Sequence, residues 1–354
     1  MSTASATAPQ RSATPAPPGL GLASFGYAFG DHRDVAATAG DYVENPKRVV
    51  NWGFRSYHRA APDVHATQLS AEAAGQALDR LGIGADDIDL VVLASSDLPE
   101  YTYWDGASAL ARELKIERTQ TLLLNEGCGA GVHGLYYVAS TMAMQPEVRT
   151  ALFVAVNRVS EFHRNRMNLV NAVLSDAAVA TVVRRGHPAN QWLATEQFTE
   201  PEHCDLLRVD FGGAVSPAPP EGWSSVGSPG GHEAVRARFG NDPAVLQRFL
   251  ENRYARLLEV IDGACARAGV RRDDIDRLIY LNDQATSIAA VADPLGIPLS
   301  RTNAALAPDH GHMGAADQLV SLGQQLDRGE VAPGELVVLC GISTDRWSAT
   351  LLRA

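Results

Sequence analysis

The sequence has few charged residues, no long apolar run and no excess of positive charge. Charged residues make up 20% of its 354 positions, and acidic residues outnumber basic ones to give a formal net charge of −11. Surfaces that bind nucleic acid are normally basic, so this balance argues against a nucleic-acid partner, although it is compatible with a local basic patch for a phosphate-bearing ligand. No apolar stretch approaches the roughly 20 residues that cross a bilayer, so we expect no membrane association.

Cysteine is also scarce, and the four cysteines Cys128, Cys204, Cys265 and Cys340 are widely spaced. They form neither a CxxC pair nor a cluster with metal-ligand spacing. We therefore expect free thiols in a reducing compartment, with the last three as ordinary buried residues. The N-terminus lacks the basic start and apolar stretch of a secretion signal, so a cytoplasmic location is expected.

The composition of the chain changes once, near its N-terminus. Residues 1–18 are rich in Ser, Thr, Ala and Pro, which predicts a disordered tail. The remainder alternates short apolar runs with amphipathic segments, a pattern typical of α/β proteins. Buried strands are expected at 92–96, 121–125, 151–156, 278–282 and 335–340, and helices at 70–82 and 250–269.

Two segments of the chain are close copies of each other. ALDRLGIGADDIDLVVLASSD (77–97) matches ACARAGVRRDDIDRLIYLNDQ (264–284) with Asp86 and Asp273 standing 187 residues apart. The same offset aligns 121–135 with 307–322 and, more roughly, 151–158 with 337–344. A constant offset over three strand–helix units indicates internal duplication. It divides the chain into halves at 19–190 and 191–354, and the apolar strands predict two sheets with helices on both faces and between them.

Cys128 is the first candidate for chemistry. It stands in NEGCGAGVHG, directly after an apolar strand and at the start of an expected helix. The flanking glycines allow a sharp turn and the close approach of a ligand to the backbone. The positive end of the helix dipole favours a thiolate, which is the nucleophilic form. A buried structural cysteine is the common alternative, but this setting favours a nucleophile.

His312 is the second candidate, because it occupies the turn of the second half that matches the Cys128 turn of the first. Such strand–helix turns are where α/β folds place their chemistry. Asp283 ends the apolar strand at 278–282, where a charged side chain needs a partner or caps a helix. Asp317 is a competing partner for the imidazole, although we expect it to face the helix surface. No third ligand of suitable spacing accompanies the two histidines of this loop, so no metal site is expected.

Taken together, these features resemble the ketoacyl synthase III family of the thiolase superfamily. The resemblance runs from about residue 20 to the C-terminus and rests on the repeated DDID units, the Cys128 turn, GFRSYHR (53–59), LSDAAVAT (174–181), HGHMGAAD (310–317) and LCGISTDRWSATLL (339–352). It implies a five-layered αβαβα subunit that forms a homodimer. It also implies an acyl thioester donor on coenzyme A or acyl carrier protein, with no permanently bound cofactor.

The resemblance also suggests residues for donor binding and charge stabilisation. Lys47, Arg48 and Arg55 fall where the family contacts the phosphates of coenzyme A, although solvated surface charges are the alternative. Gly341 stands where the family places a backbone N–H of the oxyanion hole, although it is also explained as a strand-end glycine. Arg164 is a candidate for contact with an acceptor or a carrier protein, as is Arg166.

The chain departs from the family pattern at two positions. Condensing members use Cys, His and Asn, whereas here Asp283 matches the family His and His312 matches the family Asn. Condensation passes through an enolate that two donors stabilise, and an ionised Asp repels that negative charge. A Cys–His–Asp set instead suits general-base activation of a hydroxyl or amine.

The expected function is therefore an acyltransferase of secondary metabolism, resembling the ketosynthase-like O-acyltransferases of antibiotic biosynthesis. It moves an acyl group from acyl-coenzyme A or acyl carrier protein, through a Cys128 thioester, to a hydroxyl or amine of a small-molecule acceptor without decarboxylative condensation. The alternatives are a β-ketoacyl synthase III-type enzyme that forms a carbon–carbon bond, and a non-catalytic partner subunit. The sequence identifies neither the acyl chain nor the acceptor.

Overall fold

The structure is a computed structural model that describes residues 19–169, 172–227 and 231–354. The expected disordered tail, 1–18, lies outside the described residues. None of the described helices combines the length and the apolarity needed to span a membrane.

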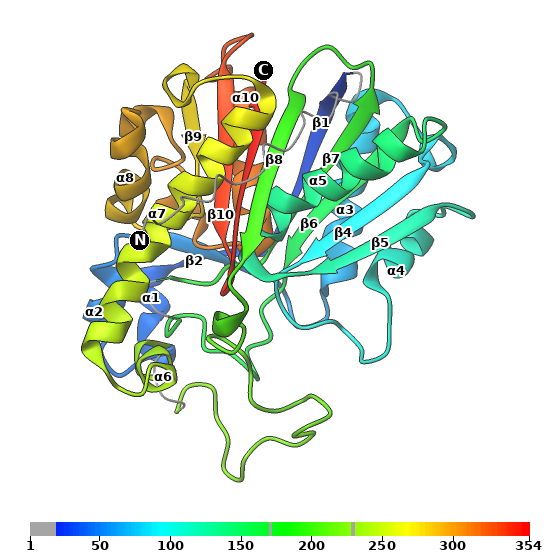
Figure 1. Cartoon of the computed structure of the whole chain (residues 1–354). Helices are drawn as coiled ribbons and strands as arrows, with labels where there is room; N and C mark the ends of the chain where they lie inside the picture. Colours follow the sequence, from blue (N-terminus) through cyan, green and yellow to red (C-terminus); the bar gives the residue numbers. More distant parts are fainter. Residues whose placement is uncertain (1–18, 170–171, 228–230) are drawn as a thin grey trace, which may run out of the picture.

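Among the residues that the structure describes, the main sheet has nine strands in the order β5-β4-β6-β7-β1-β8-β11-β10-β9 (Figure 1). The first group is β5 (Gln120–Asn125), β4 (Leu90–Ser95), β6 (Thr150–Asn157), β7 (Ala177–Arg185) and β1 (Leu20–Phe29). The second group is β8 (Gln191–Thr199), β11 (Arg346–Arg353), β10 (Leu336–Ile342) and β9 (Arg277–Ile279). Among the described residues, a single register pair, Gly21 with Gln191, joins β1 to β8. The two expected sheets are thus present but joined at a narrow seam.

Helices cover both outer faces of this sheet and fill the space between its two groups. They are α3 (Ala66–Leu81), α4 (Gly106–Glu113), α5 (Ala130–Met144), α7 (Pro243–Ala268), α8 (Ala285–Ala292) and α10 (Asp317–Asp327). One buried cluster joins Leu135 of α5 and Leu319 of α10 to Phe153 of β6 and Leu339 of β10, so α5 and α10 lie between the two groups. Separate clusters pack α3 and α4 on the first group and α7 and α8 on the second. The resulting layers run α-β-α-β-α, as expected.

The strands are apolar on both sides because both of their faces are covered. Every residue of β6 is buried. Successive side chains of a strand point to opposite faces, and in β6 Phe153 joins the central cluster while Leu152 and Val154 join the outer one. A strand buried on both faces therefore reads as a continuous apolar run rather than an alternating one.

The 187-residue offset recurs in the folded chain. Helices α3 and α7 end at Gly82 and Gly269, which both adopt the left-handed conformation. Short 3-10 turns at Gly127–Gly129 and Gly314–Ala316 lead directly into α5 and α10. The matching turns therefore place Cys128 and the residues after His312 at equivalent points of the two halves.

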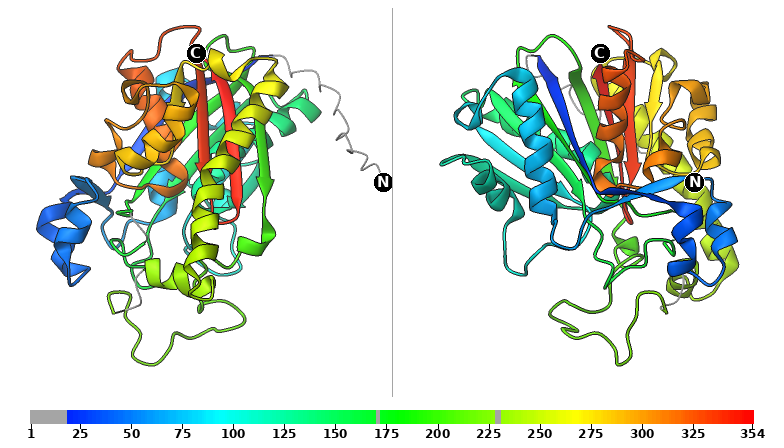
Figure 2. Two further views of the ribbon diagram at one scale, coloured as in Figure 1. Left: turned by 60° about the vertical axis from the view of Figure 1, so that its left-hand side comes forward. Right: turned by 180° about the vertical axis from the view of Figure 1, so that it is seen from behind.

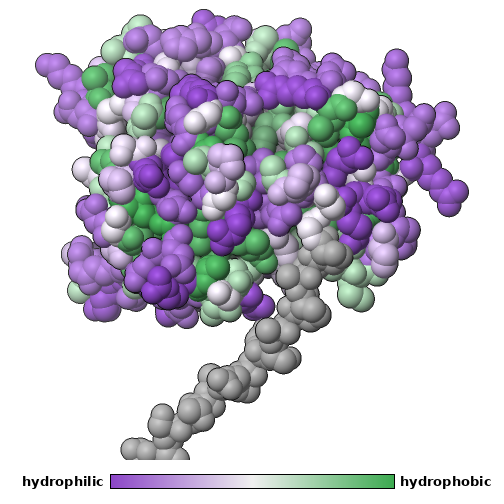
Figure 3. Space-filling model, turned by 90° about the horizontal axis from the view of Figure 1, so that it is seen from above, coloured by the Kyte–Doolittle hydropathy of each residue, from purple (hydrophilic) through white to green (hydrophobic). Residues whose placement is uncertain are grey.

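A smaller lobe lies at one end of the main sheet (Figure 2). It comprises β2 (Asp31–Asp34), α1 (Val35–Thr38), α2 (Pro46–Val50) and β3 (Ser56–Arg59). Its own buried cluster includes Val35, Val49 and Phe54. The remaining helices are α6 (Gly231–Arg238) and α9 (Ala307–His310). Seen from above, the surface is mostly hydrophilic with several separate hydrophobic patches (Figure 3).

Candidate active site

Cys128 lies in the turn between β5 and α5, as the sequence predicted. Gly127 has a φ of 71°, which an L side chain rarely adopts, so a glycine is required at this point of the turn. At the start of α5, a Cβ on Gly131 would stand 2.0 Å from the carbonyl oxygen of Ala315. Glycine therefore lets the Cys128 turn pack directly against the corresponding turn of the second half.

His312 is held by the backbone of a neighbouring segment. Its N–H donates to the carbonyl of Val173 at 2.8 Å, and its carbonyl accepts the N–H of Ser175 at 2.9 Å. The loop is thus held on both sides by Val173 and Ser175, at the start of the LSDAAVAT segment. This explains why two motifs far apart in the sequence belong to the same site.

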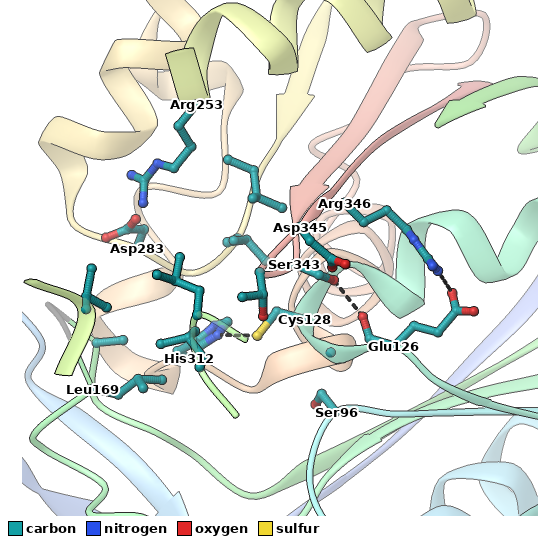
Figure 4. Close-up of a pocket in the computed structure, with 18 of the residues that line it drawn as sticks. Ser96, Glu126, Cys128, Leu169, Arg253, Asp283, His312, Ser343, Asp345 and Arg346 are labelled. Atoms are coloured by element: carbon teal, nitrogen blue, oxygen red, sulfur yellow. Dashed lines mark hydrogen bonds and ion pairs between the residues drawn. The ribbon is translucent and has the colours of Figure 1, made fainter. Parts of the chain in front are cut away.

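Cys128, His312 and Asp317 form a continuous hydrogen-bonded chain (Figure 4 shows the first two). The Nε2 atom of His312 lies 3.0 Å from the Sγ atom of Cys128. The Nδ1 atom of the same ring lies 2.6 Å from Oδ2 of Asp317. His312 is 6% exposed and Asp317 is fully buried, whereas Cys128 is only partly buried. A substrate therefore reaches the thiol while the rest of the chain is shielded from water.

The structure corrects the expected partner of His312. Asp283 was expected to hold the imidazole and Asp317 to face the surface, but Asp317 makes this contact. The first residue of α10 points inward, where its carboxylate also accepts the N–H groups of Asn282 at 2.8 Å and Met313 at 2.6 Å. Asp283 instead accepts the N–H of Gln284 at 2.7 Å and lines the same cavity. Helical periodicity does not reveal such an inward turn at the first position of a helix.

The charges of this chain favour a protonated imidazole at rest. Burial alone lowers the pKa of His312, because it penalises the charged ring. The carboxylate of Asp317 and the sulfur of Cys128 outweigh this effect and raise the pKa of His312 well above its usual 6.5. The arrangement therefore favours a protonated His312 ring between the sulfur of Cys128 and the carboxylate of Asp317.

A second group of contacts fixes the Cys128 turn from the C-terminal strands. The hydroxyl of Ser343 donates to the carbonyl of Glu126 at 2.6 Å and accepts the N–H of Gly129 at 3.0 Å. Arg346 pairs with the carboxylate of Glu126. The neighbouring His133 ring and the Arg346 guanidinium hold the pKa of Glu126 at about 2. Sequence analysis missed these residues, because only tertiary folding brings β10 and β11 next to the turn.

Gly341 directly precedes residues that line the site and does not line it itself. It belongs to β10, in register with Ser348 of β11, and a Cβ there would meet Gln318 at 2.7 Å. The residues of this segment that line the cavity begin with its neighbours Ile342 and Ser343. An oxyanion-hole role for the Gly341 N–H remains a prediction.

The basic residues expected to bind coenzyme A lie outside the Cys128 cavity. Lys47, Arg48 and Arg55 are exposed and do not line it. Arg55 forms two hydrogen bonds with Asp309, both 2.6 Å long. Arg48 donates to Asn168 at 3.0 Å. Their contact with a donor remains a prediction.

Arg164 and Arg166 have different environments. Arg166 is fully buried and pairs with Asp176 at 2.7 Å, so it stabilises the interior and is not available to an acceptor or carrier protein. Arg164 lines the cavity. Of the pair of candidates, only Arg164 is placed to contact a substrate.

The cavity around Cys128 has a volume of about 590 Å³. Its apolar lining residues include Leu169, Leu206, Phe249, Leu250, Leu281 and Ile342. Cys204, expected to be buried, is exposed and also lines this cavity. Cys265 and Cys340 are buried as expected, and burial raises the pKa of Cys265 to about 11. Cys128 is the cysteine that contacts a histidine held by a carboxylate.

Comparison with known proteins agrees with this fold. Residues 265–354 match the family model described as the C-terminal part of 3-oxoacyl-[acyl-carrier-protein] synthase III. The β-ketoacyl-[acyl-carrier-protein] synthase III of Rhodospirillum centenum is 26% identical over 86% of this chain and 89% of its own length.

Solved structures of similar proteins also share this fold. The ChlB3 acyltransferase superposes with a TM-score of 0.81 at 21% identity and covers 95% of this chain and 98% of its own. The 3-oxoacyl-(acyl carrier protein) synthase III of Pseudomonas aeruginosa has a TM-score of 0.75 at 22% identity, covering 95% and 98%. The chain therefore has the thiolase fold of these structures, and its sequence is similar to that of the β-ketoacyl-[acyl-carrier-protein] synthase III enzymes.

Proposed function

We propose that the protein is an acyltransferase that carries an acyl group as a thioester on Cys128 and passes it to a hydroxyl or amine of a small molecule. The observation that carries this proposal is the chain from Cys128 Sγ through His312 to the Asp317 carboxylate, with distances of 3.0 and 2.6 Å. The donor is an acylated carrier protein, which the names of the relatives support, or an acyl-coenzyme A, which follows from the resemblance of the sequence.

Loading begins from the thiolate. The sulfur of Cys128 attacks the thioester carbonyl of the donor, and the donor's carbon–sulfur bond breaks. The departing thiolate takes the proton from Nε2 of His312. The product is an acyl-Cys128 thioester beside a neutral imidazole, because the negative charge that favoured the imidazolium has been consumed.

Transfer uses this neutral imidazole as a general base. Nε2 of His312 accepts the proton of the acceptor hydroxyl or amine as its oxygen or nitrogen attacks the acyl carbon. The bond between that carbon and Sγ breaks and restores the thiolate. Asp317 keeps Nδ1 protonated and stabilises the imidazolium as it forms again.

Condensation fits this site less well, because a second donor for an enolate is missing from the expected positions. The family histidine position holds Asp283, whose charge repels an enolate. The amide of Asn282 lines the cavity but is engaged elsewhere: its Nδ2 donates to Gly311 at 3.0 Å, and its Oδ1 accepts from Asn303 at 2.9 Å. Because relatives of this chain are named as ketoacyl synthases, condensation is the alternative function.

The decisive experiment is intact-protein mass spectrometry with a panel of acyl-coenzyme A and acyl carrier protein donors. We expect one acyl mass to be added, and Cys128→Ala to abolish it. Cys204→Ala is the matched control, because Cys204 lines the same cavity without a histidine partner, and it should load normally. Label on Cys204 in the Cys128 variant would contradict the assignment.

Product analysis separates the two reactions. With a malonyl-type donor and an acceptor, transfer gives an ester or amide that retains the carboxylate. Release of carbon dioxide with a chain-extended β-keto product would replace the proposal with the condensing alternative.

A further inference from the structure

Four arginines line the Cys128 cavity, and they fall into two pairs. Arg208 and Arg346 are bound to carboxylates of neighbouring residues. Arg164 and Arg253 form no ion pair with any residue that the structure describes, and the Nε atom of each is buried without an acceptor. A buried guanidinium N–H without an acceptor is costly, so each such group calls for an explanation.

Of these two arginines, Arg253 gives the clearer indication of a bound ligand. It projects from α7 and is half-buried. Its Nη2 donates to the hydroxyl of Tyr254 at 2.8 Å, and its guanidinium stacks on that ring at 4.8 Å. These contacts orient the guanidinium but leave its Nε–H unused. Arg164, by contrast, lies in the field of the nearby Asp97 carboxylate.

Arg253 and Asp283 both line the cavity and lie near each other, and among the described residues neither a hydrogen bond nor an ion pair joins them (Figure 4). Burial raises the pKa of Asp283 more than the Gln284 N–H and the Arg253 guanidinium lower it. The two side chains therefore lie near each other at the wall of the cavity without forming an ion pair. A ligand in this part of the cavity meets a guanidinium that has no carboxylate partner among the described residues.

We propose that Arg253 binds a carboxylate at the far end of the acyl group on Cys128, so that the enzyme transfers half-thioesters of short dicarboxylic acids. This inference rests on the proposed acyl-Cys128 thioester. A planar guanidinium binds a carboxylate through charge-assisted hydrogen bonds that are stronger than neutral ones. A phosphate of the donor shares this chemistry, but it carries up to two charges and would be repelled more strongly by Asp283.

The test compares donors of nearly equal shape. Malonyl-coenzyme A and isovaleryl-coenzyme A differ in a carboxylate against two methyl groups, as do succinyl- and 4-methylpentanoyl-coenzyme A. The rate of Cys128 acylation is measured for each by intact mass, and the charged-to-neutral ratio is compared between variants. Arg253→Gln should lower this ratio about 10-fold or more, the usual effect of losing a hydrogen bond to a charged group. Arg253→Lys should retain part of it.

The matched control is Arg256→Gln, one turn along the same helix. Arg256→Gln removes the same positive charge. Arg256 pairs with Glu200 and Glu259, however, and does not line the cavity. Its ratio should equal that of the unmodified protein. Asp283→Asn should raise the ratio, because it removes a charge that opposes the carboxylate. Opposite shifts at Arg253 and Asp283 are not expected from loosened packing.

Two outcomes would overturn the inference. An unchanged ratio in Arg253→Gln would show that Arg253 does not recognise the acyl carboxylate. An equal loss with charged and neutral donors would assign Arg253 to the phosphates of the donor instead.

A second readout does not require acyl transfer. Free succinate should slow the alkylation of Cys128 by iodoacetamide, the neutral succinamide should not, and Arg253→Gln should abolish this protection. If no donor acylates Cys128, the proposed function fails, yet protection still decides whether Arg253 binds a carboxylate. Absence of protection in the unmodified protein would count against the carboxylate site itself.

Discussion

At the scale of single residues, Asp317 is the buried carboxylate that orients the His312 ring and raises its pKa. Its carboxylate accepts three N–H groups, from the His312 ring and from the backbones of Asn282 and Met313. These three donors fix the direction of the carboxylate. Asp317 is therefore a positioning residue that acts on substrate through His312.

Replacing this charge should slow the second half-reaction. In Asp317→Asn the amide retains the shape but no longer stabilises the imidazolium, so we expect transfer to fall by roughly 10²–10⁴ and acyl-enzyme to accumulate. Single-turnover mass spectrometry with a neutral acyl group follows both steps. Asp283→Asn should slow this transfer far less. Equal slowing by the two variants would return Asp283 to the role first expected of it.

His58 gives a residue-scale prediction about stability. Its ring lies against the carbonyl of Gly30 at 3.2 Å and against His310 at 3.1 Å. Burial, followed by the neighbouring His310, lowers the pKa of His58 from 6.5 to about 4. Above pH 6.5 neither folded nor unfolded His58 binds a proton, so it has no effect there. Between pH 6.5 and 4 the unfolded chain takes up a proton first, so folding stability falls by up to about 3 kcal/mol.

Thermal or chemical unfolding between pH 7 and 4.5 checks this. His58→Gln should flatten the loss of stability on acidification. The same acid loss in the His58 variant as in the unmodified protein would refute the assignment.

At the scale of elements, the close contact between the Cys128 turn and the turn before α10 sets the geometry of the site. A Cβ at Gly131 would stand 2.0 Å from the Ala315 carbonyl, which is backbone and has little room to move. Gly131→Ala should therefore destabilise the fold by about 1–3 kcal/mol and move Cys128 away from His312. A Cβ added at Gly75 in α3 has no atom within 4 Å. Gly75→Ala should therefore stabilise the fold by up to about 1 kcal/mol. A lower melting temperature for Gly131→Ala and a higher one for Gly75→Ala would support this prediction. Equal decreases in both variants would contradict it.

At the scale of the whole molecule, β5 stands at one edge of the main sheet and pairs with β4 on one side. Its six residues, QTLLLN, contain neither proline nor lysine to protect the edge. We expect a second copy of the chain to pair with this edge about a two-fold axis, giving the homodimer expected from the sequence.

Light scattering over a wide concentration range measures the mass directly. Thr121→Lys places like charges at the exposed edge and should shift the dimer toward single chains, whereas Lys at the exposed Asp63, away from this edge, should not. A single-chain mass for the unmodified protein at all concentrations would refute the dimer.

The sequence by itself determined five of the apolar strands, the duplication and the two residues that meet at the centre of the site. Apolar runs covered on both faces, a constant offset and glycine-flanked turns are local signals, and they located Cys128 and His312. Only tertiary structure decided that Asp317 holds the imidazole, that Ser343 fixes the Cys128 turn and that Arg253 forms no ion pair with a carboxylate of the described residues. These features depend on which way a side chain turns and on which distant backbone lies next to it. Packing sets both, and spacing along the chain does not encode them.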